Sequence, residues 1–527
     1  MTLFLWGHPL LYADFHKIGR AIPRTIHSAT LLFFTILTNK KRITMTTLTK
    51  SVKMGVATLA IMNVTAVVSL RGLPAEAEYG ISSAFYYLFA ALVFLIPTSF
   101  VAAELAAMFQ DKQGGVFRWV GEAFGKRMGF VAIWLQWVES TIWYPTVLTF
   151  GAVSLAFIGM NDNADMSLAS NKLYTLVVVL AIYWVATYIS LKGLGWVSKV
   201  AKVGGLIGTI IPAALLVLLG IIYLIGGGKS QMDFGGDFFP DITKLDNLVL
   251  ASGIFLFYAG MEMTGIHVKD MENPSKNYPK AVFMGAIITV LIFVLGTFAL
   301  GIIIPQQDIN LTQSLLVGFD NYFAFVGASW LSPIIALALA FGVLAGVLTW
   351  VSGPSKGIFA VGKAGYLPPF MQKSNKLGVQ KNILLIQGGV VTILSLLFVV
   401  MPSVQSFYQI LSQLTVLLYL IMYLLMFAAA IYLRYNMKDT PRPFRLGKSG
   451  NGIMWIVAGV GFLGSLLAFV LSFIPPAQIS VGSNGVWYAV LIIGCIVVVG
   501  APFVIYAMRK PHWVDKDSQF EPFHFEK

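Results

Sequence analysis

Long apolar runs constrain the fold of this chain more than any other feature of its sequence. A helix needs about 20 mostly apolar residues to cross the hydrocarbon core of a bilayer, which is about 30 Å thick. Twelve such runs occur in the 527 residues. They lie near 52–77, 81–109, 128–158, 173–192, 197–226, 249–268, 280–304, 331–361, 382–401, 405–433, 452–474 and 486–508. Because they lack the alternation of a barrel strand, they predict an all-α membrane protein with about twelve transmembrane helices.

The composition also indicates a lipid environment. Hydrophobic residues make up 57% of the chain and charged residues only 11%, whereas a soluble domain carries about 25% charged residues. The mean hydropathy is +0.79. A water-soluble protein of this composition would need an apolar surface, so we expect the lipid bilayer to cover that surface.

The positive charges are divided unevenly between the two sides of the predicted membrane. With the N-terminus in the cytoplasm, 32 of the 36 Lys and Arg residues fall on the cytoplasmic side and 4 on the other. This asymmetry is the positive-inside pattern of a multi-pass bacterial inner-membrane protein, and it predicts that both termini are cytoplasmic. The net charge of +13 is thus a topology signal and does not indicate nucleic-acid binding.

The sequence divides into one membrane domain and two ends. We expect a poorly ordered cytoplasmic extension at 1–50, a transmembrane domain at 51–508 and a cytoplasmic tail at 509–527. Apolar residues recur at helical spacing in 305–330, which predicts an amphipathic helix on the outer surface or, less favoured, a surface for a protein partner.

No pattern in the chain indicates an enzyme. Cys495 is the only cysteine, so neither a disulfide within the chain nor a cysteine-based metal site can form. HExxH and Walker A motifs do not occur, and the one GxSxG match, at 353–357, lies within an apolar run and not at the strand-to-helix turn that a catalytic serine of this kind needs. The sequence therefore predicts no catalytic residues, no metal and no cofactor.

Two predicted spans contain residues that interrupt helices. The sixth span has Gly260 and Gly265 on either side of Glu262, and glycine weakens a helix. The first span ends in Arg-Gly-Leu-Pro at 71–74, where the proline lacks a backbone N–H donor. Interrupted helices in corresponding positions of two halves mark the binding sites of many transporters. A site between these two spans is therefore expected.

Ionisable residues inside spans are costly and point to function. Glu262 either braces the interrupted helix or relays a proton, and the alternative is a hydrogen bond to a neighbouring helix. Glu139 pairs with a substrate ammonium or with Arg71, or only contacts another helix. Glu104 is expected to cap or salt-bridge the loop at 114–119. Arg71, near the outer mouth, attracts an anionic substrate group or extends to the interface, and we favour the second interpretation.

Three aromatic residues and one histidine complete the candidates. Trp350 precedes Gly-Pro-Ser-Lys-Gly at 353–357, where an indole can close over an amino acid or stack on a cation, or serve only in packing. Tyr419 and Tyr423 are four residues apart, so they share one helix face. His267 is expected to make an ordinary hydrogen bond in preference to sensing pH.

Several segments together carry a family resemblance: Gly-Met-Glu at 260–262, the run at 267–279, Ala-Glu-Leu at 103–105, Gly-Gly-Val-Phe at 114–117, 201–204, 238–241, and Trp350 with 353–357. Between about residues 50 and 508, the chain resembles amino acid–polyamine–organocation superfamily permeases. Within that superfamily it is most similar to the bacterial glutamate/GABA antiporters.

The resemblance implies a five-plus-five inverted repeat with broken helices one and six, plus two extra helices. It also implies a substrate site between the broken helices, closed by helices three, eight and ten. The residues at the matching positions are Met62, Asn63, Val64, Thr65, Tyr258, Ala259, Gly260, Met261, Trp350, Tyr419 and Tyr423. Members exchange external glutamate for internal GABA. Paired with a cytoplasmic amino acid decarboxylase, this exchange consumes a cytoplasmic proton and supports acid resistance.

The chain departs from the family pattern near the site. Gly346 stands where the best-known exchangers have a glutamate, Arg71 lies near the position of a helix-one aromatic residue, and Glu139 replaces a neutral residue. These changes redistribute charge and leave the exact substrate pair open. The tail after Ala507 is short, so a C-terminal plug of the kind known in the family is expected to be absent or reduced.

We therefore predict an amino acid antiporter that works by alternating access without ATP, on glutamate and GABA or a related amino acid. Glu262, Glu139 and Arg71 are its candidate coupling or gating residues. The alternative is a proton-coupled uptake permease in which Glu139 or Glu262 titrates. An amino acid sensor is less favoured, because a sensor usually carries a signalling domain and none is evident.

Overall fold

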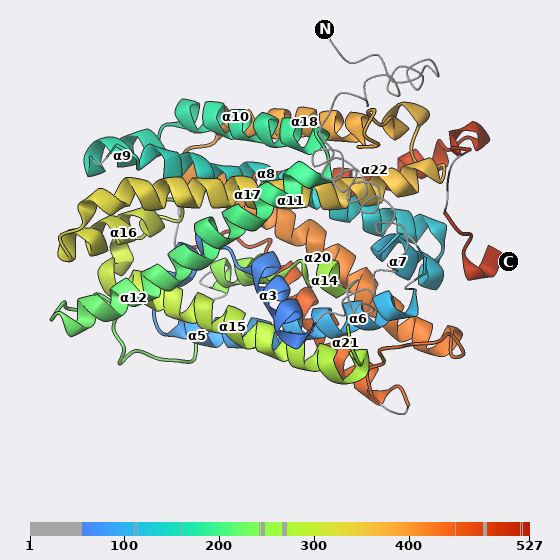
Figure 1. The fold of residues 1–527 in the computed structure, drawn as a ribbon, viewed down its shortest axis with the longest axis horizontal. Coiled ribbons are helices and arrows are strands. Elements are labelled where there is room, and N and C mark those ends of the chain that lie inside the picture. Colours follow the sequence, from blue (N-terminus) through green and yellow to red (C-terminus); the bar gives the residue numbers. More distant parts are fainter. Residues whose placement is uncertain are drawn as a thin grey trace, which may run out of the picture. The chain divides into compact units, whose positions relative to one another are not determined.

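The computed structural model describes residues 55–109, 111, 112, 114–159, 161–241, 243, 248–265, 271–447, 450–477, 482–516, 518 and 520–526. The predicted N-terminal extension at 1–50 and His267 lie outside these residues. The described part consists of helices and their connections, apart from one isolated bridge between Ala364 and Val514. These helices (Figure 1) confirm the predicted all-α class.

Nine helical segments of the described part are long and apolar enough to cross a membrane, and they correspond to nine of the predicted runs. The segments are α5 (Ser82–Ala90) continuing through the π-helical turn η3 (Ala91–Leu95) into α6 (Ile96–Met108), α10 (Lys172–Leu191), α11 (Leu194–Gly205) continuing through the π-helical turn η4 (Leu206–Ile210) into α12 (Ile211–Ile225), α15 (Pro274–Ile303), α17 (Ser332–Lys363), α18 (Lys381–Ser395) with α19 (Leu397–Val400), α20 (Val404–Asn436), α21 (Gly452–Leu471) and α22 (Asn484–Ala507).

The first, third and sixth predicted runs have a different character. The first is interrupted and forms α3 (Val56–Val67), a short 3-10 turn η2 (Leu70–Gly72) and α4 (Leu73–Ala77), and the sixth forms α13 (Gly253–Tyr258) and α14 (Met261–Gly265). The third is a continuous helix, α8 (Lys126–Ala156), that carries several polar residues in its middle. A total of twelve transmembrane helices, and the inverted repeat, stay predictions.

Local sequence explains where several helices begin. The Asn171 side chain accepts hydrogen bonds from the backbone N–H groups of Leu173 and Tyr174, which starts α10. The Ser403 hydroxyl accepts the N–H of Ser406 at 3.0 Å and starts α20. Such caps satisfy N–H groups that have no partner inside the helix.

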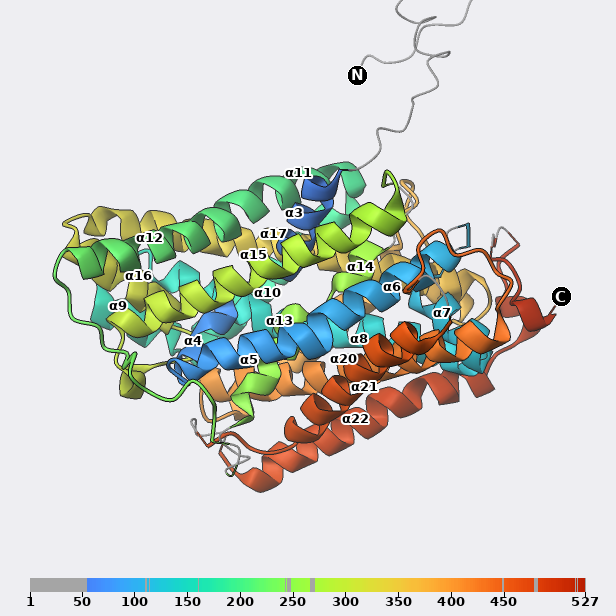
Figure 2. The ribbon, with the colours of Figure 1, turned by 90° about the horizontal axis from the view of Figure 1, so that it is seen from below.

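The interrupted helices lie in the middle of the bundle. α8 packs against both α17 and α20, α11 runs along α17, and α15 lies against α3. In Figure 1, α3 and α14 are seen between α17 above and α15 below. Figure 2 shows α21 and α22 at one edge, where they flank α20 as two additional helices.

Short helices cover the ends of the bundle. They are α7 (Val116–Phe124), α9 (Asp162–Ala169), α16 (Ser314–Phe325) and the 3-10 turns η6 (Leu250–Ser252), η8 (Gln306–Asp308), η9 (Ser329–Leu331), η10 (Pro369–Gln372), η11 (Pro511–Trp513) and η12 (His524–Glu526). α16 confirms the helix predicted in 305–330. Its apolar residues, Leu315 and Phe319 among them, are buried against α12, α15 and α17. The position of α16 on the outer surface of the membrane stays a prediction.

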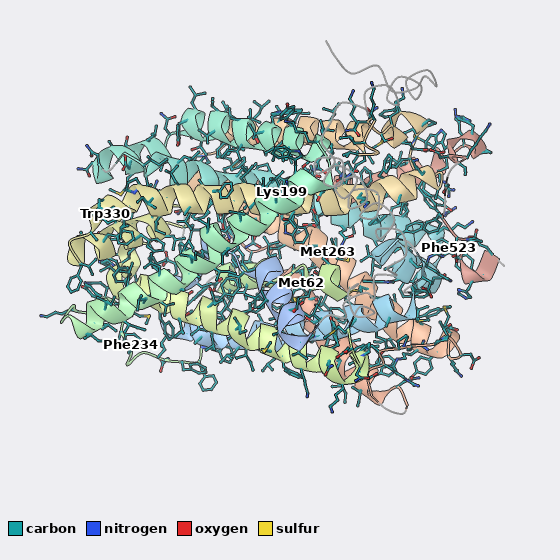
Figure 3. The ribbon with its side chains drawn as sticks, viewed as in Figure 1. Met62, Lys199, Phe234, Met263, Trp330 and Phe523 are labelled. Carbon is teal, nitrogen blue, oxygen red and sulfur yellow. The ribbon has the colours of Figure 1, made fainter. Side chains whose placement is uncertain are left out.

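The C-terminal tail folds onto the protein. Gln372 donates to the carbonyl of Trp513 at 2.7 Å, and Arg118 of α7 donates to the carbonyls of Glu521 and Pro522. Phe523 is 1% exposed and lies where the tail meets α7 (Figure 3). Within the described residues, the tail lines no part of the cavity discussed below.

Candidate functional site

The interruption of the sixth helix falls where the sequence predicts it. Ala259 is extended, with ψ 153°, and Gly260 has a φ of +110°, a conformation that only glycine adopts without strain. The Gly260 N–H, which has no partner inside the helix, donates to the Tyr423 hydroxyl at 2.9 Å. The predicted break at Tyr258, Ala259, Gly260 and Met261 is thus present.

The interruption of the first helix lies further along the chain than residues 62–65, the position that the family resemblance implies. Met62, Asn63, Val64 and Thr65 belong to α3, and the chain becomes extended at Val68 and Ser69. The helix restarts at Leu73 with Pro74 in its first turn, where proline is tolerated. A Cβ on Gly72 would lie 2.3 Å from the Phe257 ring, so α13 packs directly on the restart.

Both interruptions border one cavity of about 640 Å³, within the usual size range of small-molecule sites. Met62, Ala259, Trp350 and Tyr419 line it together with Arg71 and Glu139. Figure 3 labels Met62 of α3 and Met263 of α14, which both face this cavity near the middle of the bundle. The predicted site residues of helices one, three, six, eight and ten therefore meet.

The other predicted residues lie around the cavity and do not line it. They are Asn63, Val64, Tyr258, Gly260, Met261, Tyr423 and Glu262; the Thr65 side chain lies outside the described part of the structure. The Tyr258 hydroxyl donates to the Tyr87 carbonyl at 3.1 Å, away from the site. Asn63 is 1% exposed, and neither atom of its amide has a hydrogen-bond partner among the described residues.

Glu262 connects α14 to two other helices. Its carboxylate accepts hydrogen bonds from Gln136 of α8 at 3.2 Å, from Tyr419 of α20 at 2.5 Å and from Tyr423 of α20. The Tyr423 hydroxyl also accepts the Gly260 N–H. Glu262 is 2% exposed, so these bonds replace the water that the carboxylate loses. These bonds include the predicted alternative, a hydrogen bond to a neighbouring helix, and the bracing role stays a prediction.

The interpretation favoured for Arg71, that its side chain extends to the interface, is wrong. Its side chain is buried, with 3% exposed, and it lines the cavity. The guanidinium donates to the hydroxyls of Tyr408 at 3.2 Å and Thr146 at 3.5 Å, and it lies 5.2–5.7 Å from the ring centres of Trp143, Phe257 and Tyr408. Because it follows the interruption directly, its side chain faces inward.

Glu139 does not form the ion pair with Arg71 that was one of the predictions. Its carboxylate accepts a hydrogen bond from Ser140 at 2.7 Å, and the described residues offer it no cation within ion-pair distance. It is 2% exposed and lines the cavity. Trp350 stands opposite on α17, with its ring 5.9 Å from that of Trp143.

Glu104 has the structural role predicted for it, but with other partners. It binds Arg434 at 2.5 Å and Arg442 at 3.3 Å, and it accepts the Leu446 N–H at 2.7 Å. These contacts hold the basic segment after α20 against α6. The predicted contact with the 114–119 loop is replaced, because Arg434 of α20 donates to both oxygens of the carboxylate.

Sequence reasoning missed several site residues. Gln136 and Ser140 lie four positions apart on α8, and with Glu139, which was predicted, they put polar groups on one helix face. This spacing is visible in the sequence. Glu76 in α4 was also missed, because it falls at the end of the first run. Its side chain is fully buried, and neither carboxylate oxygen has a hydrogen-bond partner in the described part.

Comparisons with known proteins agree with this arrangement. The sequence model of amino acid permeases matches residues 54–499. An uncharacterised transporter of Legionella pneumophila is 36% identical over 86% of this chain and 96% of its own. A glutamate/gamma-aminobutyrate antiporter of Lactococcus lactis is 32% identical over 84% of this chain and 87% of its own. An aspartate/glutamate permease of Lactococcus lactis is 26% identical over 78% and 86%, respectively.

Proposed function

Because the chain belongs to the amino acid permease family, we propose that it is a secondary active antiporter that exchanges glutamate for GABA or a related amino acid. It works in the bacterial inner membrane with both termini in the cytoplasm, and a cytoplasmic amino acid decarboxylase supplies its counter-substrate. The similarity to the glutamate/gamma-aminobutyrate antiporter of Lactococcus lactis, at 32% identity, supports the substrate pair.

The cavity between the two interrupted helices is the observation that carries this proposal. An interruption leaves N–H groups at the start of one segment and C=O groups at the end of the other without partners inside the helix. Such groups attract a carboxylate and an ammonium, respectively. Val68, Ser69 and Ala259 border the cavity, so their main chain holds the α-carboxylate and α-amino groups. Met62 contacts the same substrate, and Asn63, Val64 and Thr65 support it from α3.

Aromatic residues and carboxylates complete the proposed cycle. Trp350 and Tyr419 close over the substrate, while Tyr423 and Glu262 hold Gly260 and with it the conformation of the sixth helix. A substrate changes the population of inward and outward states only by binding them differently. Obligate exchange therefore requires that the empty carrier reorients slowly.

Counterflow in proteoliposomes tests this function. Vesicles are loaded with glutamate, GABA, glutamine, or other neutral and basic amino acids, and uptake of labelled glutamate is followed at several pH values. We expect accumulation only when glutamate or GABA is inside, and empty vesicles serve as the control. The substrate assignment fails if neither exchanges at any pH.

Glu139 supports proton-coupled uptake as a second candidate. This carboxylate lines the cavity and accepts a hydrogen bond from the Ser140 hydroxyl. With so few donors around it in the described part of the chain, a protonated form is accommodated there at little cost. Net uptake into vesicles without internal amino acid, driven by an inwardly directed proton gradient, would favour this function over exchange.

A further inference from the structure

Arg71 is the one buried arginine of the described residues without a carboxylate partner. Arg118 and Arg434 are equally buried, and each binds a glutamate: Glu122 at 3.1 Å and Glu104 at 2.5 Å. Arg71 has only the neutral hydroxyls of Tyr408 and Thr146, and its Nε has no partner in the described part of the chain. A buried charge that lacks a counter-charge is costly, so this exception needs an explanation.

The surroundings of Arg71 orient its guanidinium but do not neutralise it. The rings of Trp143, Phe257 and Tyr408 lie within cation–π distance and exclude water from the group. Phe257 is itself fixed against Gly72. The guanidinium thus has a defined place on the cavity wall, with donor capacity left for a ligand.

We propose that Arg71 binds the side-chain carboxylate of glutamate, which is also the carboxylate that GABA retains. The cavity then selects substrates with a carboxylate several bonds from the carbon that carries the amino group. This inference rests on the proposed function and assigns the substrate class within it. Guanidinium is the cation best suited to a carboxylate, because its planar N–H groups match the two oxygens. The bound substrate supplies the missing counter-charge.

The side-chain carboxylate fits Arg71 better than the α-carboxylate does. The α-carboxylate is adjacent to the α-ammonium, and that positive charge would be repelled by an arginine that has no acidic partner. A side-chain carboxylate is separated from the ammonium by several bonds. An amino acid with a neutral side chain leaves Arg71 without a counter-charge, so rejection of neutral analogues comes from the same residue.

The test compares glutamate with glutamine, which has nearly the same shape but no side-chain charge. Counterflow of labelled glutamate gives KM for glutamate, and inhibition by unlabelled glutamine gives its Ki, for the wild type and for Arg71→Gln. We expect the variant to raise KM for glutamate about 10- to 100-fold, the effect of losing a charge-assisted hydrogen bond. The Ki of glutamine should change by less than about threefold.

Two further variants make the outcome decisive. Arg71→Lys keeps the charge without the planar fork and should restore part of the preference for glutamate, even if Arg71→Gln does not fold. Lys229→Gln removes an exposed positive charge far from the cavity lining and should change neither constant.

Each alternative result has its own meaning. Equal weakening of glutamate and glutamine would contradict the proposal, because Arg71 would then hold the α-carboxylate or only the fold. Unchanged constants, or a wild type that does not prefer glutamate to glutamine, would also overturn it. If the wild type exchanges neutral or basic amino acids but not glutamate, the inference about Arg71 fails and antiport itself survives. If it exchanges no amino acid, the proposed function itself fails.

Discussion

At the residue scale, Glu262 is the side chain on which the most contacts converge. Its carboxylate accepts three hydrogen bonds from two helices, and one donor, Tyr423, also holds the Gly260 N–H. We expect Glu262→Ala to lower the free energy of unfolding by about 1–3 kcal/mol, because buried donors are left without an acceptor. Thermal unfolding of the detergent-solubilised protein measures this loss.

Glu139→Ala is the matched control for that substitution. Glu139 is buried to the same extent, but its side-chain donor is the Ser140 hydroxyl, whereas Glu262 has three donors. Removal of Glu139 should therefore cost less stability than removal of Glu262. Tyr419→Phe, which removes one of the three bonds, should give an intermediate value. Equal melting temperatures for wild type and Glu262→Ala would show that the bracing network does not stabilise the fold.

The sequence located the important residue types better than their surroundings. Glu262 was predicted near the break because a charge next to glycine within an apolar run is unusual, whereas the two helix-ten tyrosines were predicted from the family resemblance. The burial of Arg71 could not be predicted, since a residue close to the end of a run can extend to the interface or fold inward. That choice depends on Phe257 and Tyr408, which are distant in sequence.

At the element scale, η4 and α17 approach so closely that their backbones touch. A Cβ on Gly208 would lie 2.3 Å from the Gly342 Cα and 2.4 Å from the Ala338 carbonyl oxygen. Backbone atoms cannot move aside as a flexible side chain does, so Gly208→Ala must separate the helices. We expect a loss of about 1–3 kcal/mol in the free energy of unfolding, measured by thermal unfolding.

Gly205→Ala controls for the general effect of replacing a helical glycine. A Cβ at Gly205, three residues earlier, would meet no atom within 4 Å, and alanine has the higher helix propensity. Its stability should be unchanged or higher. If both variants behave alike, contact between these two helices does not contribute to stability.

Element boundaries that depend on nearby sequence alone were predicted better than those that depend on distant residues. The nine apolar spans were predicted because the length of an apolar run fixes them without reference to neighbours. The interruption at 68–69 lies between the two places predicted for it, 62–65 from the family resemblance and 71–74 from the glycine and proline there. Helix α3 includes the first of these places, and the chain unwinds between it and Gly72, against which Phe257 of α13 packs.

At the scale of the whole molecule, a charged cluster on α7 holds the end of the C-terminal tail. Glu122 of α7 accepts hydrogen bonds from the His524 ring at 2.5 Å and its backbone N–H at 3.0 Å, and it pairs with Arg118 and Lys112. The short sequence of the tail gave no sign of this docking, because its partners lie about 400 residues earlier. That a C-terminal plug is absent or reduced stays a prediction.

The charge on Glu122 makes the docking dependent on pH. Burial by itself raises the pKa of Glu122, but the hydrogen bonds from His524 and the charge of Lys112 outweigh burial and lower it below the ordinary value. A carboxyl group whose pKa is lower in the docked state favours docking above the ordinary pKa of about 4.3. This contribution disappears as the pH falls through the lowered pKa.

Hydrogen exchange of residues 520–526 measures this dependence. We expect protection, expressed relative to an unstructured peptide at each pH, to be constant near neutral pH and to fall below about pH 4. Glu122→Gln should show weak protection already at pH 7 and a smaller acid transition, because the docked segment then keeps the carboxylate of Glu526, which pairs with Lys126 and accepts a backbone N–H of the tail. Glu521→Gln removes an exposed carboxylate of the tail and should behave as the wild type. An acid transition of wild-type size in Glu122→Gln would mean that another group controls docking.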